Sequence, residues 1–140
     1  MISFKEYLIL NEEVSPLISK HGDYEHNFNH NNTPVKVLYS NDGKKTYDVD
    51  FQIDKGWGRG KNRTSEQKKE GYKILHKIGA HVEDFIKSRR PKILKLNGNT
   101  PKKNRAYEAV ARHMAKKYGG QYTPPEDMDN DPHEIVFPHH

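Results

Sequence analysis

Apolar and polar residues begin to alternate regularly at Val35. Residues 35–39 and 46–53 are two apolar-rich runs joined by Ser40-Asn41-Asp42-Gly43, a turn-forming sequence that predicts a β-hairpin. The second run alternates without a break, with Tyr47, Val49, Phe51 and Ile53 on one face and Asp48, Asp50 and Gln52 on the other. This alternation predicts an antiparallel strand with one face in the core and one toward solvent.

The spacing then changes to the three and four residues of helices. A first helix is expected from the capping box of Thr64 and Gln67 to the Arg90-Pro91 step, and its apolar stripe is Tyr72, Leu75, Ile78, Val82, Phe85 and Ile86. Residues 92–96 predict a strand. A second helix is expected to end at Gly119-Gly120, and its stripe is Tyr107, Val110, Ala111, Met114 and Tyr118.

A final strand at 121–123 or 134–137 would complete a β-β-α-β-α-β order. The sequence therefore predicts an α/β (α+β) fold with a small mixed sheet and two main helices. Residues 35–140 are expected to form one domain, with an acidic loop over 124–132 that lacks the pattern of a calcium loop.

Residues 1–34 are expected to be a leader followed by a flexible arm, because Pro, Gly and Asn interrupt every apolar run between 13 and 34. Potential metal ligands lie within this arm, namely His21, Asp23, Glu25, His26 and His30. Their spacing matches no established zinc signature, and no metal site is predicted.

The net charge of +5 is unevenly distributed along the chain. Residues 1–53 carry a net charge of −3, residues 54–118 carry +13, and residues 119–140 carry −5. Such a concentration of cations favours contact with packaged DNA or another anionic partner, although a solvated surface balanced by the acidic tail is the alternative. The residues predicted to form this basic surface are Lys61, Arg63, Lys68, Lys69, Arg89, Arg90, Lys102, Lys103 and Arg105.

Composition narrows the remaining classes. There is no Cys, so disulfides and thiolate metal sites are excluded. No run of about 18 apolar residues and no secretory leader is present, so neither a membrane partner nor general export is expected. A soluble protein of one domain is expected, whose low hydrophobic content of 32% leaves polar ends outside the core.

The first twelve residues, Met-Ile-Ser-Phe-Lys-Glu-Tyr-Leu-Ile-Leu-Asn-Glu, form a short amphipathic segment that closes on Leu-x-Glu. They resemble the capsid-targeting leaders of internal head proteins of large tailed bacteriophages. That resemblance implies cleavage by a prohead protease after Glu12, and location in the virion after assembly in the host bacterial cytoplasm. An ordinary N-terminal helix, with a capping box of Ser3 and Glu6, is the alternative.

A second resemblance covers residues 46–123, whose strand, glycine loop, helix, strand and helix are similar to the core of GNAT acetyltransferases. The resemblance implies acetyl-CoA as cofactor, bound through the loop Lys55-Gly56-Trp57-Gly58-Arg59-Gly60, with Asn99 and Tyr107 matching the family's later polar residues. In some members that Tyr is the general acid toward the departing thiolate. Here Lys replaces the usual first residue of the loop, and 61–63 separate the loop from the helix.

No carboxylate can be assigned as a general base, because Asp48 and Asp50 are equally well explained as solvent-facing. Signatures of hydrolases, P-loop enzymes and zinc proteases are missing, and the helix histidines His76, His81 and His113 are expected at the surface. The sequence thus predicts a non-catalytic virion protein with a degenerate GNAT-like core that needs no cofactor and binds virion proteins or DNA. A GNAT-type acetyltransferase and an injected inhibitor of a host enzyme or defence system are the alternatives.

Overall fold

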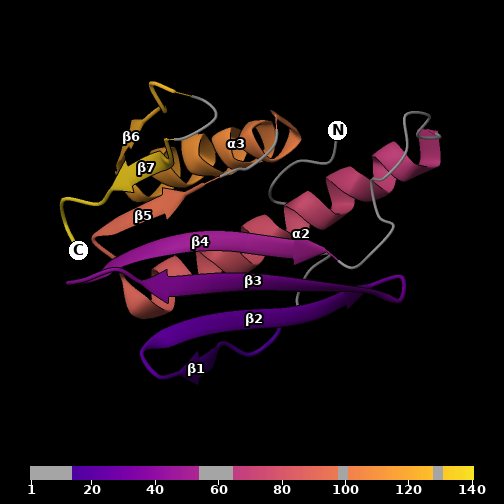
Figure 1. Cartoon of the computed structure of the whole chain (residues 1–140), viewed down its shortest axis with the longest axis horizontal. Helices are drawn as coiled ribbons and strands as arrows, with labels where there is room; N and C mark the ends of the chain where they lie inside the picture. The colour runs from indigo at the N-terminus through magenta and orange to yellow at the C-terminus, as the bar shows by residue number, and fades with distance from the viewer. Residues whose placement is uncertain (1–13, 54–64, 98–100, 128–130) are drawn as a thin grey trace.

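Figure 1 shows the elements of the computed structural model, which describes residues 14–53, 65–97, 101–127 and 131–140, and of 65–72 and 101–103 only the backbone. The elements are β1 (Ile18–Lys20), β2 (Asp23–His30), β3 (Thr33–Asn41), β4 (Thr46–Ile53), α2 (Ser65–Arg89), β5 (Ile93–Leu96), α3 (Pro101–Tyr118), β6 (Gln121–Thr123) and β7 (His133–Val136). The predicted α/β (α+β) fold with a mixed sheet and two main helices is confirmed.

The strands form one sheet in the order β1-β2-β3-β4-β5-β7-β6. All neighbours are antiparallel except β4 and β5, which run parallel from the Thr46–Ile93 pair to the Val49–Leu96 pair. A parallel pair needs a long crossover connection, and α2 lies within that connection. Because β5 ends opposite Val49, residues 50–53 of β4 extend past it.

One face of the sheet forms the core. Alternate residues of the central strands are buried on this face: Val35, Val37, Tyr39, Tyr47, Val49, Phe51, Leu94, Leu96 and Ile135. Both helices pack here, α2 through Phe85 against Tyr39, with ring centroids 4.0 Å apart, and α3 through Tyr107 against Phe51, at 4.9 Å. No helix among the described residues covers the opposite face, here called the open face (Figure 1).

The helical stripes expected from the sequence are confirmed at most positions whose side chains are described, whereas Leu75 and Tyr118 are only partly buried and pack against the core. Ile78, Val82, Phe85 and Ile86 are buried on α2, and Tyr107, Val110, Ala111 and Met114 are buried on α3. Between the helices, Glu83 is buried and accepts hydrogen bonds from Lys117 and from the hydroxyl of Tyr118, the latter at 2.6 Å. This network ties the two helices together through a charge that would otherwise be costly to bury.

The expectation of a flexible arm over residues 13–34 is wrong, because β1 and β2 lie within it and β2 pairs with β3 from Tyr24 to His30. The alternation in β2 is hidden because its core-facing residues include His26 and His30, which are buried. The Asn residues that suggested disorder form the turn: Asn31 and Asn32 have φ values of 47° and 64°. Both central residues of a type I′ hairpin turn have positive φ, which Asn tolerates.

Two further differences concern element order. Four strands precede α2, where two were expected, and both candidate strands at the C-terminal end form, as β6 and β7, where one was expected. The predicted hairpin at Asn41–Gly43 is confirmed, although β3 starts at Thr33 and not at Val35. The capping residue Thr64 lies outside the described residues.

Candidate functional site

The outer face of α3 carries a line of cations. Arg105, Arg112 and Lys116 are exposed and are separated by seven and four residues, which places them on one side of the helix, opposite the buried stripe. Ala109, also exposed, lies between the first two. With a rise of 1.5 Å per residue, the line from Arg105 to Lys116 is about 16 Å long.

Neighbouring side chains hold Arg112 in place. Its guanidinium lies over the ring of Tyr122, 4.9 Å from the centroid, and its Nε donates to Glu108 at 3.1 Å. Tyr122 is itself fixed, because its hydroxyl is 2.7 Å from Nδ1 of His133 and the two rings are stacked. Arg112 is therefore presented to solvent from a supported position.

The two layers of the molecule differ in charge. On α2 and α3, the described side chains include eight cations and three carboxylates. On the open face, the strands carry five carboxylates, Asp23, Glu25, Asp48, Asp50 and Glu134, and three cations, Lys20, Lys36 and Lys95. A polyanion is therefore attracted to the helical side.

Of the predicted basic residues, the three whose side chains the structure describes, Arg89, Arg90 and Arg105, do not lie in one site. Arg89 and Arg90 lie at the end of α2, just before β5, whereas Arg105 follows β5 and so lies at its other end. Arg89 lies 4.7 Å over the ring of Tyr24, and Arg90 donates to the carbonyl of His139. Lys61 and Arg63, and the side chains of Lys68, Lys69, Lys102 and Lys103, lie outside the described residues. Sequence reasoning missed Arg112 and Lys116, although their spacing from Arg105 could have revealed them.

A second candidate site lies where β4 extends past β5. The hydroxyl of Tyr107 accepts a hydrogen bond from the backbone N–H of Phe51 at 3.2 Å and donates one to Asp50 at 3.1 Å. Burial raises the pKa of Tyr107 far above its ordinary value, with the carboxylate of Asp50 acting in the same direction. The phenol therefore stays protonated and anchors the edge of β4.

The remaining residues proposed for acetyl-CoA binding lie outside the described residues. They are Lys55, Gly56, Gly58, Arg59 and Gly60 of the glycine loop, together with Asn99, and the processing residue Glu12 also lies outside. Of the acetyltransferase set, only Tyr107 is placed, and it is part of the core.

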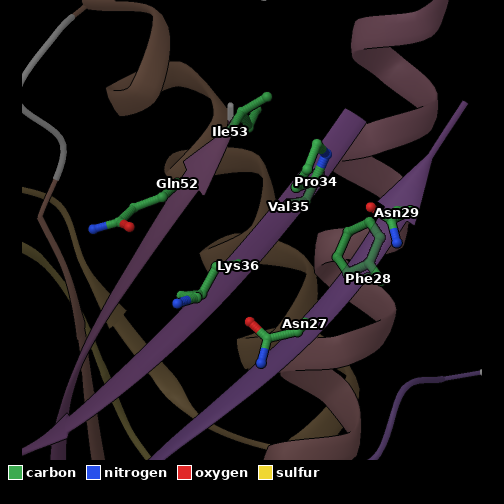
Figure 2. A pocket seen from close by; sticks show the side chains of 8 residues that line it. All are labelled: Asn27, Phe28, Asn29, Pro34, Val35, Lys36, Gln52 and Ile53. Carbon is green, nitrogen blue, oxygen red and sulfur yellow. The ribbon is translucent and has the colours of Figure 1, made fainter. Parts of the chain in front are cut away.

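Figure 2 shows an open hollow at one end of β2, β3 and β4. Its lining consists of Asn27, Phe28, Asn29, Pro34, Val35, Lys36, Gln52 and Ile53. These side chains offer carboxamides and one ammonium group, but neither a carboxylate nor a histidine. The hollow can hydrogen-bond a polar ligand, yet its lining holds no pair of groups for acid–base catalysis.

A buried histidine cluster joins β2 to α2, and it was also missed from the sequence. His26 donates from Nε2 to Asp84 at 3.1 Å, and its Nδ1 is 2.9 Å from the hydroxyl of Tyr39. Burial lowers the pKa of His26 below its ordinary value and raises that of Tyr39. The expectation that His81 lies at the surface is wrong, because it is 3% exposed beside this cluster.

His81 connects the segment before β1 to α2. Its Nδ1 is 2.6 Å from the carbonyl oxygen of Lys77, and its Nε2 is 3.1 Å from the backbone nitrogen of Ser15. A carbonyl can only accept and an amide N–H can only donate, so these partners fix the neutral tautomer with the proton on Nδ1. Burial lowers the pKa of His81 to about 4, which keeps the ring neutral near pH 7.

The described residues include no group of three or more His, Cys, Asp or Glu side chains that could hold a metal ion. Within the described part of the chain, no helix is both long and apolar enough to cross a membrane. The chain matches no protein-family model, no curated protein and no solved structure.

Proposed function

We propose that the protein is a non-catalytic component of a tailed-bacteriophage particle that binds packaged DNA or other virion proteins through its basic helical side. The observation that carries the binding role is the one-sided charge, because the described helices combine eight cations with three carboxylates. The resemblance of residues 1–12 to capsid-targeting leaders supports the location in the virion.

The arrangement of polar groups favours binding over turnover. The hydroxyl of Tyr107 is committed on both sides, to the N–H of Phe51 and to Asp50, and the histidines of the buried cluster are enclosed by the core. The hollow at the end of β2, β3 and β4 lacks an acid–base pair. The exposed cations of the helices, such as Arg105, Arg112 and Lys116, serve attraction to an anionic partner.

Mass spectrometry of purified particles of the phage that encodes the chain tests this proposal. A chain that starts after Glu12 in the particle, while the protein made alone starts at Met1, would establish a packaged and processed head protein. An uncut chain at fixed stoichiometry would support a virion component and reject the processing step. Absence from the particle would overturn the proposal.

An acetyl-CoA-dependent acetyltransferase of GNAT type is the second candidate. It is favoured by the parallel pairing of β4 with β5, which are joined through α2 and followed by α3, the element order on which the resemblance of residues 46–123 rests. Calorimetric titration with acetyl-CoA separates the two candidates. Saturable binding that is lost in a Gly58→Asp, Gly60→Asp double variant would support the acetyltransferase, and no binding at millimolar acetyl-CoA would reject it.

A further inference from the structure

The outer face of α3 is better suited to bind a regularly charged polymer than to bind the surface of another protein. Its outer face presents Arg105, Arg112 and Lys116 with only Ala109 between them, so no large apolar side chain is available there as an anchor. The centre of a protein–protein interface carries aromatic anchors and is depleted in Lys and Glu, whereas the outer face of α3 has Lys116 and Glu108 and no aromatic residue. Among the described residues, the one exposed large hydrophobic residue is Ile18, in β1 at the far edge of the sheet from β6.

The length of the line suits a nucleic acid backbone. Over about 16 Å of helix axis, B-form DNA presents about five phosphates on each strand. The three side chains are long and flexible enough to reach successive phosphates of one DNA strand. Because Ala109 is small, the DNA backbone can approach the helix closely. Contacts of this kind carry no sequence information, which agrees with the lack of a sequence-reading motif in the chain.

Contacts within the protein orient the side chain of Arg112 for binding a phosphate. Its Nε donates to Oε1 of Glu108 at 3.1 Å, and its Nη2 lies 3.0 Å from the same oxygen, so the N–H groups on the other side of the guanidinium can donate to a phosphate oxygen. The ring of Tyr122 supports the guanidinium, so little side-chain freedom is lost on binding. Glu108 reduces the local positive charge and is therefore expected to limit the affinity.

We propose that the outer face of α3 binds the phosphate backbone of double-stranded DNA without sequence preference, through Arg105, Arg112 and Lys116. This inference rests on the proposed function. It limits the partner to DNA, where the proposed function allowed DNA or virion proteins, and it limits the binding surface to α3. The acidic open face of the sheet is then directed away from the DNA, so the protein binds in one orientation.

Fluorescence anisotropy of a labelled duplex over a range of salt concentrations tests the inference on the full chain. Each phosphate contact contributes about 0.9 to the slope of log affinity against log salt, so the triple variant Arg105→Gln, Arg112→Gln, Lys116→Gln should reduce the slope by about 2.7. The matched control is Lys44→Gln, Lys45→Gln, Lys92→Gln, which removes the same charge from exposed positions at the β3–β4 turn and before β5. The control should leave the slope unchanged.

Equal slopes for the wild type and the α3 variant would overturn the inference, as would a wild-type protein that binds no duplex at low salt. A parallel loss in the α3 and control variants would also overturn it, because general attraction by net charge would then suffice. Glu108→Gln provides a gain-of-binding test that does not depend on removing a side chain from the site, and it should tighten binding. Presence of the chain in the particle is measured separately, so failure of DNA binding leaves the virion role distinguishable.

Discussion

Acidification should destabilise the protein through His81. The ring is neutral in the folded state, with its proton on Nδ1 and its Nε2 accepting from the backbone N–H of Ser15. Protonation at Nε2 would replace that acceptor by a second donor and place a cation beside Lys77 and His26. Burial is the largest cause of the lowered pKa, and the hydrogen bond to the carbonyl of Lys77 and the carboxylate of Asp84 oppose it only in part.

The expected size follows from the pKa values of the two states. The unfolded chain binds a proton at His81 near pH 6.5, whereas the folded protein does so only near pH 4. Between these values the unfolded state holds more protons, so the free energy of unfolding falls as the pH falls. The total loss is about 3 kcal/mol, complete below pH 4 and absent above pH 6.5.

Urea denaturation followed by circular dichroism, at intervals from pH 7.5 to pH 4, measures this loss. His81→Gln removes the titrating group, while its side-chain amide can still accept from Ser15. Between pH 7.5 and pH 4, the free energy of unfolding of His81→Gln should therefore fall by about 3 kcal/mol less than that of the wild type. His133, whose pKa is also lowered by burial, has no interaction with His81 and should contribute equally to both proteins, whereas the ring of His26 lies 4.9 Å from that of His81 and its titration has to be followed separately by NMR in each protein.

Parallel pH profiles for the wild type and His81→Gln would refute this reasoning. If the variant does not fold, NMR titration of the ring protons of His81 in the wild type gives the pKa directly, and a value at or above 6 would refute it equally. A lower protection factor against hydrogen exchange at the Ser15 amide on acidification, after correction for the intrinsic pH dependence of exchange, would show that this contact is lost.

Three further changes test the packing. Tyr107→Phe should lower the free energy of unfolding by about 1–3 kcal/mol in urea titrations, because the N–H of Phe51 loses its acceptor; unchanged stability would show that this bond contributes nothing. Tyr118→Phe should cost about 1–3 kcal/mol by the same measurement, because buried Glu83 loses a donor, and a neutral result would contradict the network. Gly120→Ala should cost about 1–3 kcal/mol, since its Cβ would lie 2.9 Å from Cγ2 of Ile135. Its control, Gly79→Ala in α2, meets no atom within 4 Å and should raise the melting temperature, with a gain of about 0.5–1 kcal/mol; equal losses at both positions would contradict the packing.

The pattern of the sequence correctly predicted those helices and strands whose buried residues are apolar. The alternation of Tyr47, Val49 and Phe51 and the stripe of α3 both correspond to buried positions, because periodicity reports which face leaves water. Periodicity did not predict β2, because His26 and His30 occupy core positions in this strand. Histidine counts as polar in a pattern of apolar and polar residues. The burial of His26 depends on its partners Tyr39 and Asp84, which are distant from it in the sequence.

The candidate sites were predictable to a smaller extent. The three cations of α3 follow from helical spacing alone, once the helix is known. The role of Tyr107 cannot be predicted in this way, because it requires that β5 end opposite Val49, so that the Tyr107 hydroxyl reaches the N–H of Phe51 beyond that end. Such a contact is set by the relative lengths of two strands that are distant in sequence, and no local pattern records that relation.

The distribution of charge along the chain gains its meaning from the topology. Most cations lie in residues 54–118, and this stretch supplies both helices, whereas the strands before it are net acidic. If the helices packed on opposite faces of the sheet, the same sequence would give a protein that is basic all round. Because both described helices pack on one face, the segregation along the sequence becomes a segregation between two sides of the molecule. A basic side opposite an acidic one favours a single orientation on a polyanion, whereas charge spread evenly over the surface would allow many.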